Sequence, residues 1–222
     1  MLMQIKPLFS FLTELSNNND RAWFQAHKAT YNQLRAQFEL DVEFWARELA
    51  QADEALAGPG ARKSVFRIYR DVRFSNNKDP YKTHFSAFFT ASSKDVDSPS
   101  YYVQLGPNGQ TLAAAGLYQP EKAQLAAVRQ EIDYNAEPLY DLLAQPGFRR
   151  FFPAMGGDKL KKAPAGYPAD HPDIDLLKHK SFVVSHELPD AAALAQADLR
   201  SYVAEVFRTA VPFCNYLREA LG

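Results

Sequence analysis

Cysteine is scarce in this chain of 222 residues, and long hydrophobic runs and an excess of one charge are missing. The single cysteine, Cys214, excludes an internal disulfide, so nothing indicates an oxidising compartment. No apolar stretch reaches the roughly 18 residues that a membrane helix needs. With 25 Lys and Arg against 26 Asp and Glu, the chain lacks the basic balance typical of dedicated nucleic-acid or anionic-membrane binders. We therefore expect a cytoplasmic protein without a membrane partner and without a nucleic-acid surface over the whole molecule, which leaves room for a local basic patch.

Motifs for metals, nucleotides and covalent catalysis are also missing. The five histidines form no HExxH pair, and one cysteine cannot build a thiolate site. No Walker loop, GxGxxG or GxSxG motif is present, so the sequence predicts no metal and no cofactor. Cys214 lies among Val211, Phe213 and Leu217, which predicts a buried, unreactive thiol.

Apolar spacing predicts helices at both ends of the chain. Phe9, Leu12 and Leu15 recur at helical spacing before the asparagine cluster 17–19, and Asp20 is placed to cap a following helix. That second helix carries apolar residues every three or four positions as far as Leu49. Similar spacing predicts helices at 120–132, 137–143 and 189–221, whereas residues 148–186 are rich in Pro, Gly and Lys and predict mostly ordered loop with short elements.

The middle of the chain changes to a period of two. This alternation predicts strands at 65–74, 85–91, 101–105 and 111–117. Short connections between successive strands favour antiparallel pairing. The sequence thus predicts an α+β fold with a mainly antiparallel sheet of about four or more strands, flanked by long N-terminal and C-terminal helices. We expect one domain over 1–222, with a helical part (1–57), the strands (64–118), and further helices with the Pro- and Lys-rich loop (119–222).

Positive charge is concentrated between Arg62 and His84. Seven Lys and Arg stand there against two Asp, a local charge of +5 that leaves −6 for the remainder. Arg70 falls on the face that is otherwise apolar, so it needs a partner, either a carboxylate inside the fold or a bound anion. On the other face Asp71 stands between two arginines, which predicts an ionised carboxylate with a lowered pKa.

The turn after this predicted strand can also gather groups around an anion. Its Asn, Asp and Pro residues favour a tight connection, and its lysines and hydroxyls are suited to a phosphate or carboxylate. Asp71 and His84 are the candidates for proton transfer. The candidate ligand-binding residues are Arg67, Arg70, Arg73, Lys78, Tyr81 and Lys82.

The same stretch resembles a known family. Its run Arg-Ile-Tyr-Arg-Asp-Val-Arg-Phe-Ser leading to Pro-Tyr-Lys-Thr, together with Trp23-Phe24 and the segment 116–120, is similar to a bacterial family catalogued only as a domain of unknown function. The resemblance extends over nearly the whole chain and implies a single α+β domain with a shared site in this region. It departs from the family pattern at Asn77, where an acidic residue is usual, and at Asp79, where the family is uncharged. It implies no activity.

Three hypotheses for function follow. The first is an anion-binding cleft for a phosphate- or carboxylate-bearing small molecule, with or without catalysis. The second is a structural or protein-interaction module in which the Arg and Asp residues form internal ion pairs. The third is single-stranded nucleic-acid binding, with tyrosines stacking bases among the cations. A ligand site leaves cations without acidic partners, whereas the structural module pairs each of them.

Overall fold

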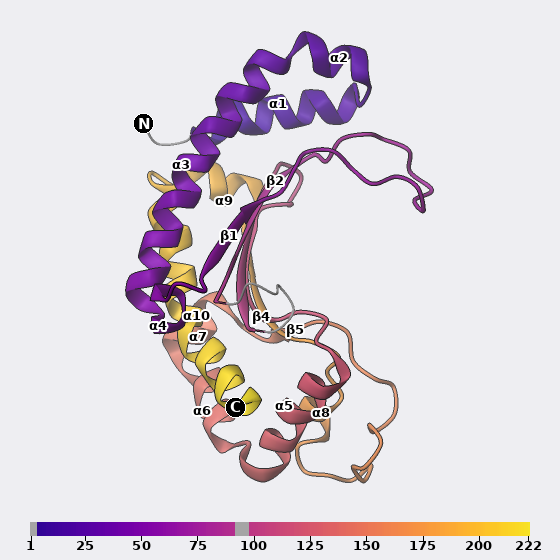
Figure 1. Ribbon diagram of the computed structural model, residues 1–222, viewed down its shortest axis with the longest axis vertical. Coiled ribbons are helices and arrows are strands. Elements are labelled where there is room, and N and C mark those ends of the chain that lie inside the picture. The colour runs from indigo at the N-terminus through magenta and orange to yellow at the C-terminus, as the bar shows by residue number, and fades with distance from the viewer. Residues whose placement is uncertain (1–3, 92–97) are drawn as a thin grey trace.

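A six-stranded antiparallel sheet, with the long helices α3 (Lys28–Ala52) and α10 (Leu199–Leu221) along one side and further helices beyond its two ends, forms the protein (Figure 1). The computed structural model describes residues 4–91 and 98–222. The strands are β1 (Arg62–Val65), β2 (Phe85–Thr90), β3 (Ser100–Leu105), β4 (Leu112–Leu117), β5 (Met155–Gly156) and β6 (Phe182–Glu187), in the spatial order β1-β2-β3-β4-β6-β5. Every neighbouring pair is antiparallel. The predicted α+β class and antiparallel sheet are confirmed.

Helices occupy both ends of the chain, as predicted. They are α1 (Ile5–Asn17), α2 (Arg21–Ala26), α3 (Lys28–Ala52), α4 (Glu54–Ala57), α5 (Lys122–Asn135), α6 (Glu137–Ala144), α7 (Pro146–Phe151), α8 (Ile174–Leu177), α9 (Asp190–Ala195) and α10 (Leu199–Leu221). Asp20 caps α2 by accepting hydrogen bonds from the backbone N–H groups of Ala22 and Trp23. The predicted continuous helix from Asp20 is divided at His27, whose ψ of 11° leaves the helical region.

One face of the sheet forms the core. Residues at every second position of β2, β3, β4 and β6 are at most 5% exposed: Phe85, Ala87, Phe89, Tyr101, Val103, Leu105, Ala113, Ala115, Leu117, Phe182 and Val184. This face packs against α3 and α10, the two longest helices, which also pack against each other. Trp45 of α3 is fully buried there and donates its indole N–H to the Arg200 carbonyl. Burial of this apolar surface supplies the main driving force for folding.

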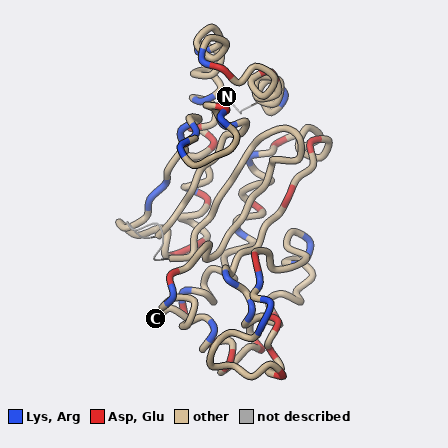
Figure 2. The backbone as a smooth tube through the Cα atoms, turned by 90° about the vertical axis from the view of Figure 1, so that its right-hand side faces the viewer, with Lys and Arg blue, Asp and Glu red and all other residues tan. Residues whose placement is uncertain are grey.

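The opposite face, called here the open face, is only half covered. Its central positions are half-buried: Phe88, Tyr102, Gln104, Leu112, Ala114, Val183 and Ser185. Figures 1 and 2 show no described helix in front of the middle of this face. The segment from β1 to β2 projects at one end of the sheet, and α5 and α8 lie at the other (Figure 1).

One strand prediction was wrong. The strand expected at 65–74 ends at Val65, because beyond that residue the chain leaves the sheet and has only its own return segment for pairing. The region 148–186, predicted as mostly ordered loop with short elements, contains the short elements α7, β5 and α8, and it also contains strand β6, which was not predicted. Strand β6 pairs along its whole length with β4, which extends the sheet beyond the four predicted strands.

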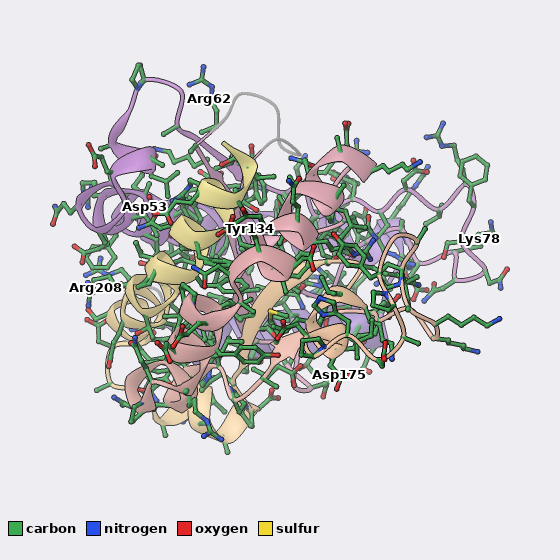
Figure 3. The ribbon with its side chains drawn as sticks, turned by 90° about the horizontal axis from the view of Figure 1, so that it is seen from below. Asp53, Arg62, Lys78, Tyr134, Asp175 and Arg208 are labelled. Carbon is green, nitrogen blue, oxygen red and sulfur yellow. The ribbon has the colours of Figure 1, made fainter. Side chains whose placement is uncertain are left out.

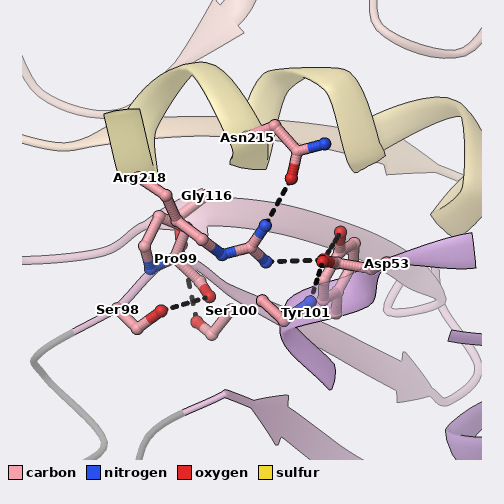
Figure 4. Close-up of polar contacts among 9 residues, drawn as sticks. Asp53, Ser98, Pro99, Ser100, Tyr101, Gly116, Asn215 and Arg218 are labelled. Atoms are coloured by element: carbon pink, nitrogen blue, oxygen red, sulfur yellow. Dashed lines mark hydrogen bonds and ion pairs between the residues drawn. The ribbon is translucent and has the colours of Figure 1, made fainter. Parts of the chain in front are cut away.

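A buried polar cluster joins the end of α3 to β3 and to the C-terminal helix α10 (Figure 4). The Asp53 carboxylate, 1% exposed, accepts hydrogen bonds from the Arg218 guanidinium at 2.5 Å and the Tyr101 hydroxyl at 2.6 Å. Cys214 is fully buried nearby on α10, and burial raises the pKa of its thiol to about 12. The predicted buried thiol is confirmed.

Candidate functional site

Residues 66–84, called here the arm, form a two-stranded ribbon that leaves the sheet after β1 and returns at β2 (Figure 1). Its backbone hydrogen bonds run from Lys82 N to Ile68 O at 2.7 Å and from Arg70 N to Pro80 O at 2.9 Å. Tyr69 and Tyr81 pair across the ribbon in an isolated bridge. The arm therefore continues the β1–β2 hairpin away from the body of the protein.

The base of the arm is fixed to the N-terminal helices. Ile68 and Tyr81 are buried, and the Tyr81 ring stacks on Phe24 of α2 with centroids 4.1 Å apart. The Asn19 side chain bonds both backbone groups of Tyr81, each at 3.1 Å. From α3, the Arg35 guanidinium donates to the Phe66 carbonyl at 3.0 Å. An isolated ribbon is only marginally stable, so these contacts set its direction.

At the tip of the arm, cations hold the loop together. Arg70 donates to the Asp79 carbonyl at 3.0 Å and to the Ser75 hydroxyl at 3.4 Å. Lys78 donates to the Val72 carbonyl at 3.0 Å. The partner that Arg70 requires is thus a carbonyl and a hydroxyl, and this half-buried guanidinium meets no carboxylate within the described chain. Figure 3 shows Lys78 at the periphery, far from Asp53.

One ion pair of the predicted ladder is present at the tip. Arg73 donates from Nε and Nη2 to the Asp71 carboxylate, at 3.0 and 2.7 Å. These hydrogen bonds hold the pKa of Asp71 below its ordinary value, in the predicted direction. Both side chains are largely exposed, so the pair adds little to stability. The Asn77 Oδ1 accepts a hydrogen bond of 2.7 Å from the backbone N–H of Asp79, which accounts for an Asn in this turn.

A second group of cations lies at the base of the arm, beside the open face. Lys82 Nζ lies 5.1 Å from the centroid of the Phe66 ring, and that ring is 6.2 Å from the ring of Tyr102 on β3. Burial lowers the pKa of Lys82, and the charge of Arg67 lowers it further. Among the ion pairs of the described residues, none includes Arg67 or Lys82.

His84 adjoins these cations. Its Nδ1 lies 3.4 Å from Gln110 Oε1, and burial lowers the pKa of its imidazole, with the charge of Lys82 acting in the same direction. His84 is therefore neutral at pH 7 and has lone-pair capacity for a proton or a hydrogen bond. We call Phe66, Arg67, Lys82, His84 and Tyr102 the base patch.

The structure divides the predicted site into three parts. Arg70, Asp71, Arg73 and Lys78 are at the tip; Arg67, Lys82 and His84 are at the base; and the Tyr81 ring points into the core. The two candidates for proton transfer, Asp71 and His84, thus fall in different parts.

Sequence reasoning missed Tyr102 of the base patch and its hydrogen-bond partner Gln104. Tyr102 and Gln104 stand at alternate positions of β3, with the Tyr102 hydroxyl donating to Gln104 Oε1 at 2.8 Å. The alternation in 101–105 places them on one face but does not identify that face as open. Asn19 is 62 residues from Tyr81, and no local pattern connects them.

Three cavities among the described residues lie away from the arm. One of about 440 Å³ is bounded by Asp41, Trp45 and Arg200, and two others are lined by α3 with β1 and by α7 with α10. Within residues 4–91 and 98–222, no cluster of three His, Cys, Asp or Glu residues is arranged to hold a metal ion. None of the described helices is long and apolar enough to cross a membrane.

A family model extends over both the arm and the helices that hold it. It is described as a conserved hypothetical protein, DUF2461, and it matches residues 7–216. The chain belongs to the DUF2461 family. The resemblance inferred from the arm residues is confirmed, and membership in DUF2461 gives no activity. Comparison with curated proteins and with solved structures found no match.

Proposed function

We propose that the protein binds a phosphate- or carboxylate-bearing anion at the base patch. The observation that carries the proposal is a pair of cations without a carboxylate partner. Arg67 lies near enough to Lys82 for its charge to lower the Lys82 pKa, and neither residue takes part in an ion pair within the described chain. Like charges held close together repel, and an anion bound between them removes that repulsion.

The chemistry of the neighbouring side chains suits this ligand. Arg67 offers a planar fork for two oxygens, and Lys82 offers a point charge. His84, kept neutral by burial, is placed to accept a proton or hydrogen bond from a ligand hydroxyl. At the tip, Asp71 is already engaged by Arg73, so it positions the arm in this proposal, and His84 is the group assigned to proton transfer.

The structural alternative has less support at these positions. It requires the cations of the arm to form internal ion pairs, but the ion pairs of the described arm residues comprise Asp71 with Arg73 alone. Arg70 and Lys78 do bond the backbone of the arm, so these two cations also have a structural role. The ligand site therefore centres on Arg67 and Lys82.

Thermal unfolding with inorganic phosphate, citrate and nucleoside monophosphates tests the proposal. A ligand at 100 times its Kd stabilises the folded state by about 2.7 kcal/mol, which for a chain of this size raises Tm by about 5–10 °C. Lys82→Met and Arg67→Gln should abolish the shift, whereas Lys161→Met, an exposed lysine outside the arm, should retain it.

Calorimetric titration of the same variants separates binding from folding. Anion binding should favour the charged form of Lys82, so proton uptake should accompany binding near the lowered Lys82 pKa and vanish in Lys82→Met. If no anion shifts Tm and both variants melt well below the wild type, the cations are structural and the proposal is wrong.

A further inference from the structure

We propose that the anion bound at the base patch is part of a single-stranded nucleic acid, whose bases stack on the open face and whose backbone follows the arm. This inference rests on the proposed function, because it assigns Arg67 and Lys82 to one phosphate of a longer chain. It adds two requirements, a surface for planar bases and cations beyond the base patch.

The surface for bases is formed by rings on three adjacent strand segments. Phe88 of β2 is directly opposite Tyr102 of β3 in the sheet register, and both are half-buried on the open face. Phe66, which follows β1, remains 42% exposed with its ring beside Tyr102. Rings on neighbouring strands of an uncovered sheet form a platform on which unpaired bases stack. In Figure 2 the open face is turned toward the viewer.

The cations extend along the arm instead of converging on one point. Arg67 and Lys82 lie at its base, and Arg73 and Lys78 belong to its tip. An extended strand rises about 3.3 Å per residue, so the six residues from Arg67 to Arg73 reach up to roughly 20 Å. That length exceeds a small metabolite and suits several linked phosphates.

The tip offers a further ring. Phe74 is 95% exposed, and the Arg73 guanidinium lies 5.7 Å from its centroid. A fully exposed phenylalanine beside cations has no function in the core of this chain. It provides an additional stacking position at the far end of the same strip.

The whole chain is nearly neutral, but few of its acidic residues lie on the strands of the open face. Within the described strands, the positions that share the open face include one acidic residue, Glu187 on β6, at the other side of the sheet from β1. On the helical side, Glu43 and Glu48 of α3 are paired with Lys63 and Arg208. These two glutamates are therefore separated from the platform by the sheet itself.

A single strand fits better than a duplex because the rings need unpaired base faces. The rings of the base patch and of β2 lie on the open face of the sheet itself, so they offer flat surfaces to unpaired bases. Stacking on aromatic rings tolerates any base, so the binding should show little sequence preference.

Fluorescence anisotropy with labelled 12-nucleotide single strands of DNA and RNA tests the inference, with a duplex and heparin as comparisons. Phe66→Leu and Tyr102→Leu should each weaken single-strand binding roughly 5- to 100-fold. Tyr134→Leu removes an 89%-exposed ring on α5 and serves as the matched control, with no expected change. DNA and RNA results identify which backbone is preferred.

The salt dependence of the affinity measures how many phosphates of the nucleic acid contact the arm. Each phosphate contact with single-stranded nucleic acid contributes about 0.7 to the slope of log affinity against log salt. Lys82→Met and Lys78→Gln should each reduce the slope by about 0.7, the first at the base and the second at the tip, whereas Lys161→Met should leave it unchanged.

Three results would overturn the inference. If phosphate binds but oligonucleotides do not, the proposed function stands and the nucleic-acid assignment fails. If duplex and heparin bind as tightly as single strands and the ring variants bind normally, the arm is a general polyanion surface. If neither phosphate nor oligonucleotide binds, both proposals fail. Circular dichroism melting of Phe66→Leu, a change at an exposed ring, verifies that lost binding is not lost folding.

Discussion

Replacement of Arg218 tests the buried cluster that joins the end of α3 to β3 and to α10. The Arg218 guanidinium and the Tyr101 hydroxyl both donate to Asp53 Oδ2, and the Ala55 N–H donates to Asp53 Oδ1 at 3.2 Å (Figure 4). Arg218→Met removes the positive charge but keeps an unbranched apolar side chain. It leaves the Asp53 carboxylate, 1% exposed, without its cationic partner.

Removing one partner of a buried ion pair costs about 3–5 kcal/mol, mostly because the remaining charge loses its compensation. Tyr101 and the Ala55 N–H still solvate Asp53, so we expect a loss near 3 kcal/mol. For a chain of this size, that loss lowers Tm by about 6–12 °C. The double variant Asp53→Asn with Arg218→Met removes the uncompensated charge as well, so it should be more stable than Arg218→Met alone.

Urea unfolding at pH 7 gives the free energies, with unchanged m-values as the test that the same transition is compared. Arg208→Met is the matched control. Arg208 lies on the same helix as Arg218 and forms an exposed ion pair with Glu48 of α3, with the two charged atoms 2.6 Å apart. Its replacement should lower the free energy of unfolding by less than about 1 kcal/mol. Equal costs for the two arginine variants would refute the reasoning, because burial would then make no difference.

Three further predictions concern other parts of the chain. Burial lowers the pKa of His179 to about 4 in the folded protein. As pH falls from about 6.5 to about 4, the His179 imidazole therefore takes up a proton in the unfolded chain but not in the folded one, and the folded state loses stability. Urea unfolding across that range should show a shallower pH dependence in His179→Gln; an identical dependence would contradict the assignment. The buried Cys214 should react with a thiol reagent only at the rate of unfolding, and rapid reaction of the native protein would be inconsistent with its environment. Asn19→Ala removes two hydrogen bonds to Tyr81, which should cost about 1–3 kcal/mol and speed amide exchange in 68–82; unchanged exchange would show that Asn19 does not hold the arm.

The sheet was predictable where one face is buried and the other is not. Phe85, Ala87 and Phe89 lie on the face that contacts the helices and alternate with Ser86, Phe88 and Thr90 on the other face, and the residues from Tyr101 to Leu105 alternate in the same way. Strand β6 was missed because its alternation includes only Phe182 and Val184 before polar residues begin, within a region rich in Pro and Lys. Its pairing partner, β4, is more than 60 residues earlier, so no local signal indicates the pairing.

In the arm, the sequence pattern predicted a longer strand than the sheet contains. Apolar residues alternate from Phe66 to Phe74 as in a strand, but the pattern does not reveal that strand β1 ends at Val65 and that the following residues leave the sheet. Ile68 is buried and Phe74 is 95% exposed, although the pattern assigns both to one face. The concentration of cations was visible in the sequence. The separation of base from tip depends on the fold, because it follows from where the ribbon leaves the sheet.

The N-terminal helices have a role that their own sequence does not indicate. The contacts of Asn19, Phe24 and Arg35 with the base of the arm come from the α1–α2 connection, α2 and α3 respectively. A ribbon outside a sheet cannot maintain its own direction, so these contacts determine where the tip lies relative to the open face. The N-terminal helices contact the arm through the rings of Tyr69 and Tyr81 and through the Phe66 carbonyl, whereas the Phe66 ring lies beside Tyr102 on the open face. The helical part therefore positions the cations without contacting the proposed ligand, and variants of Asn19 should weaken binding through the arm's direction while leaving every cation in place.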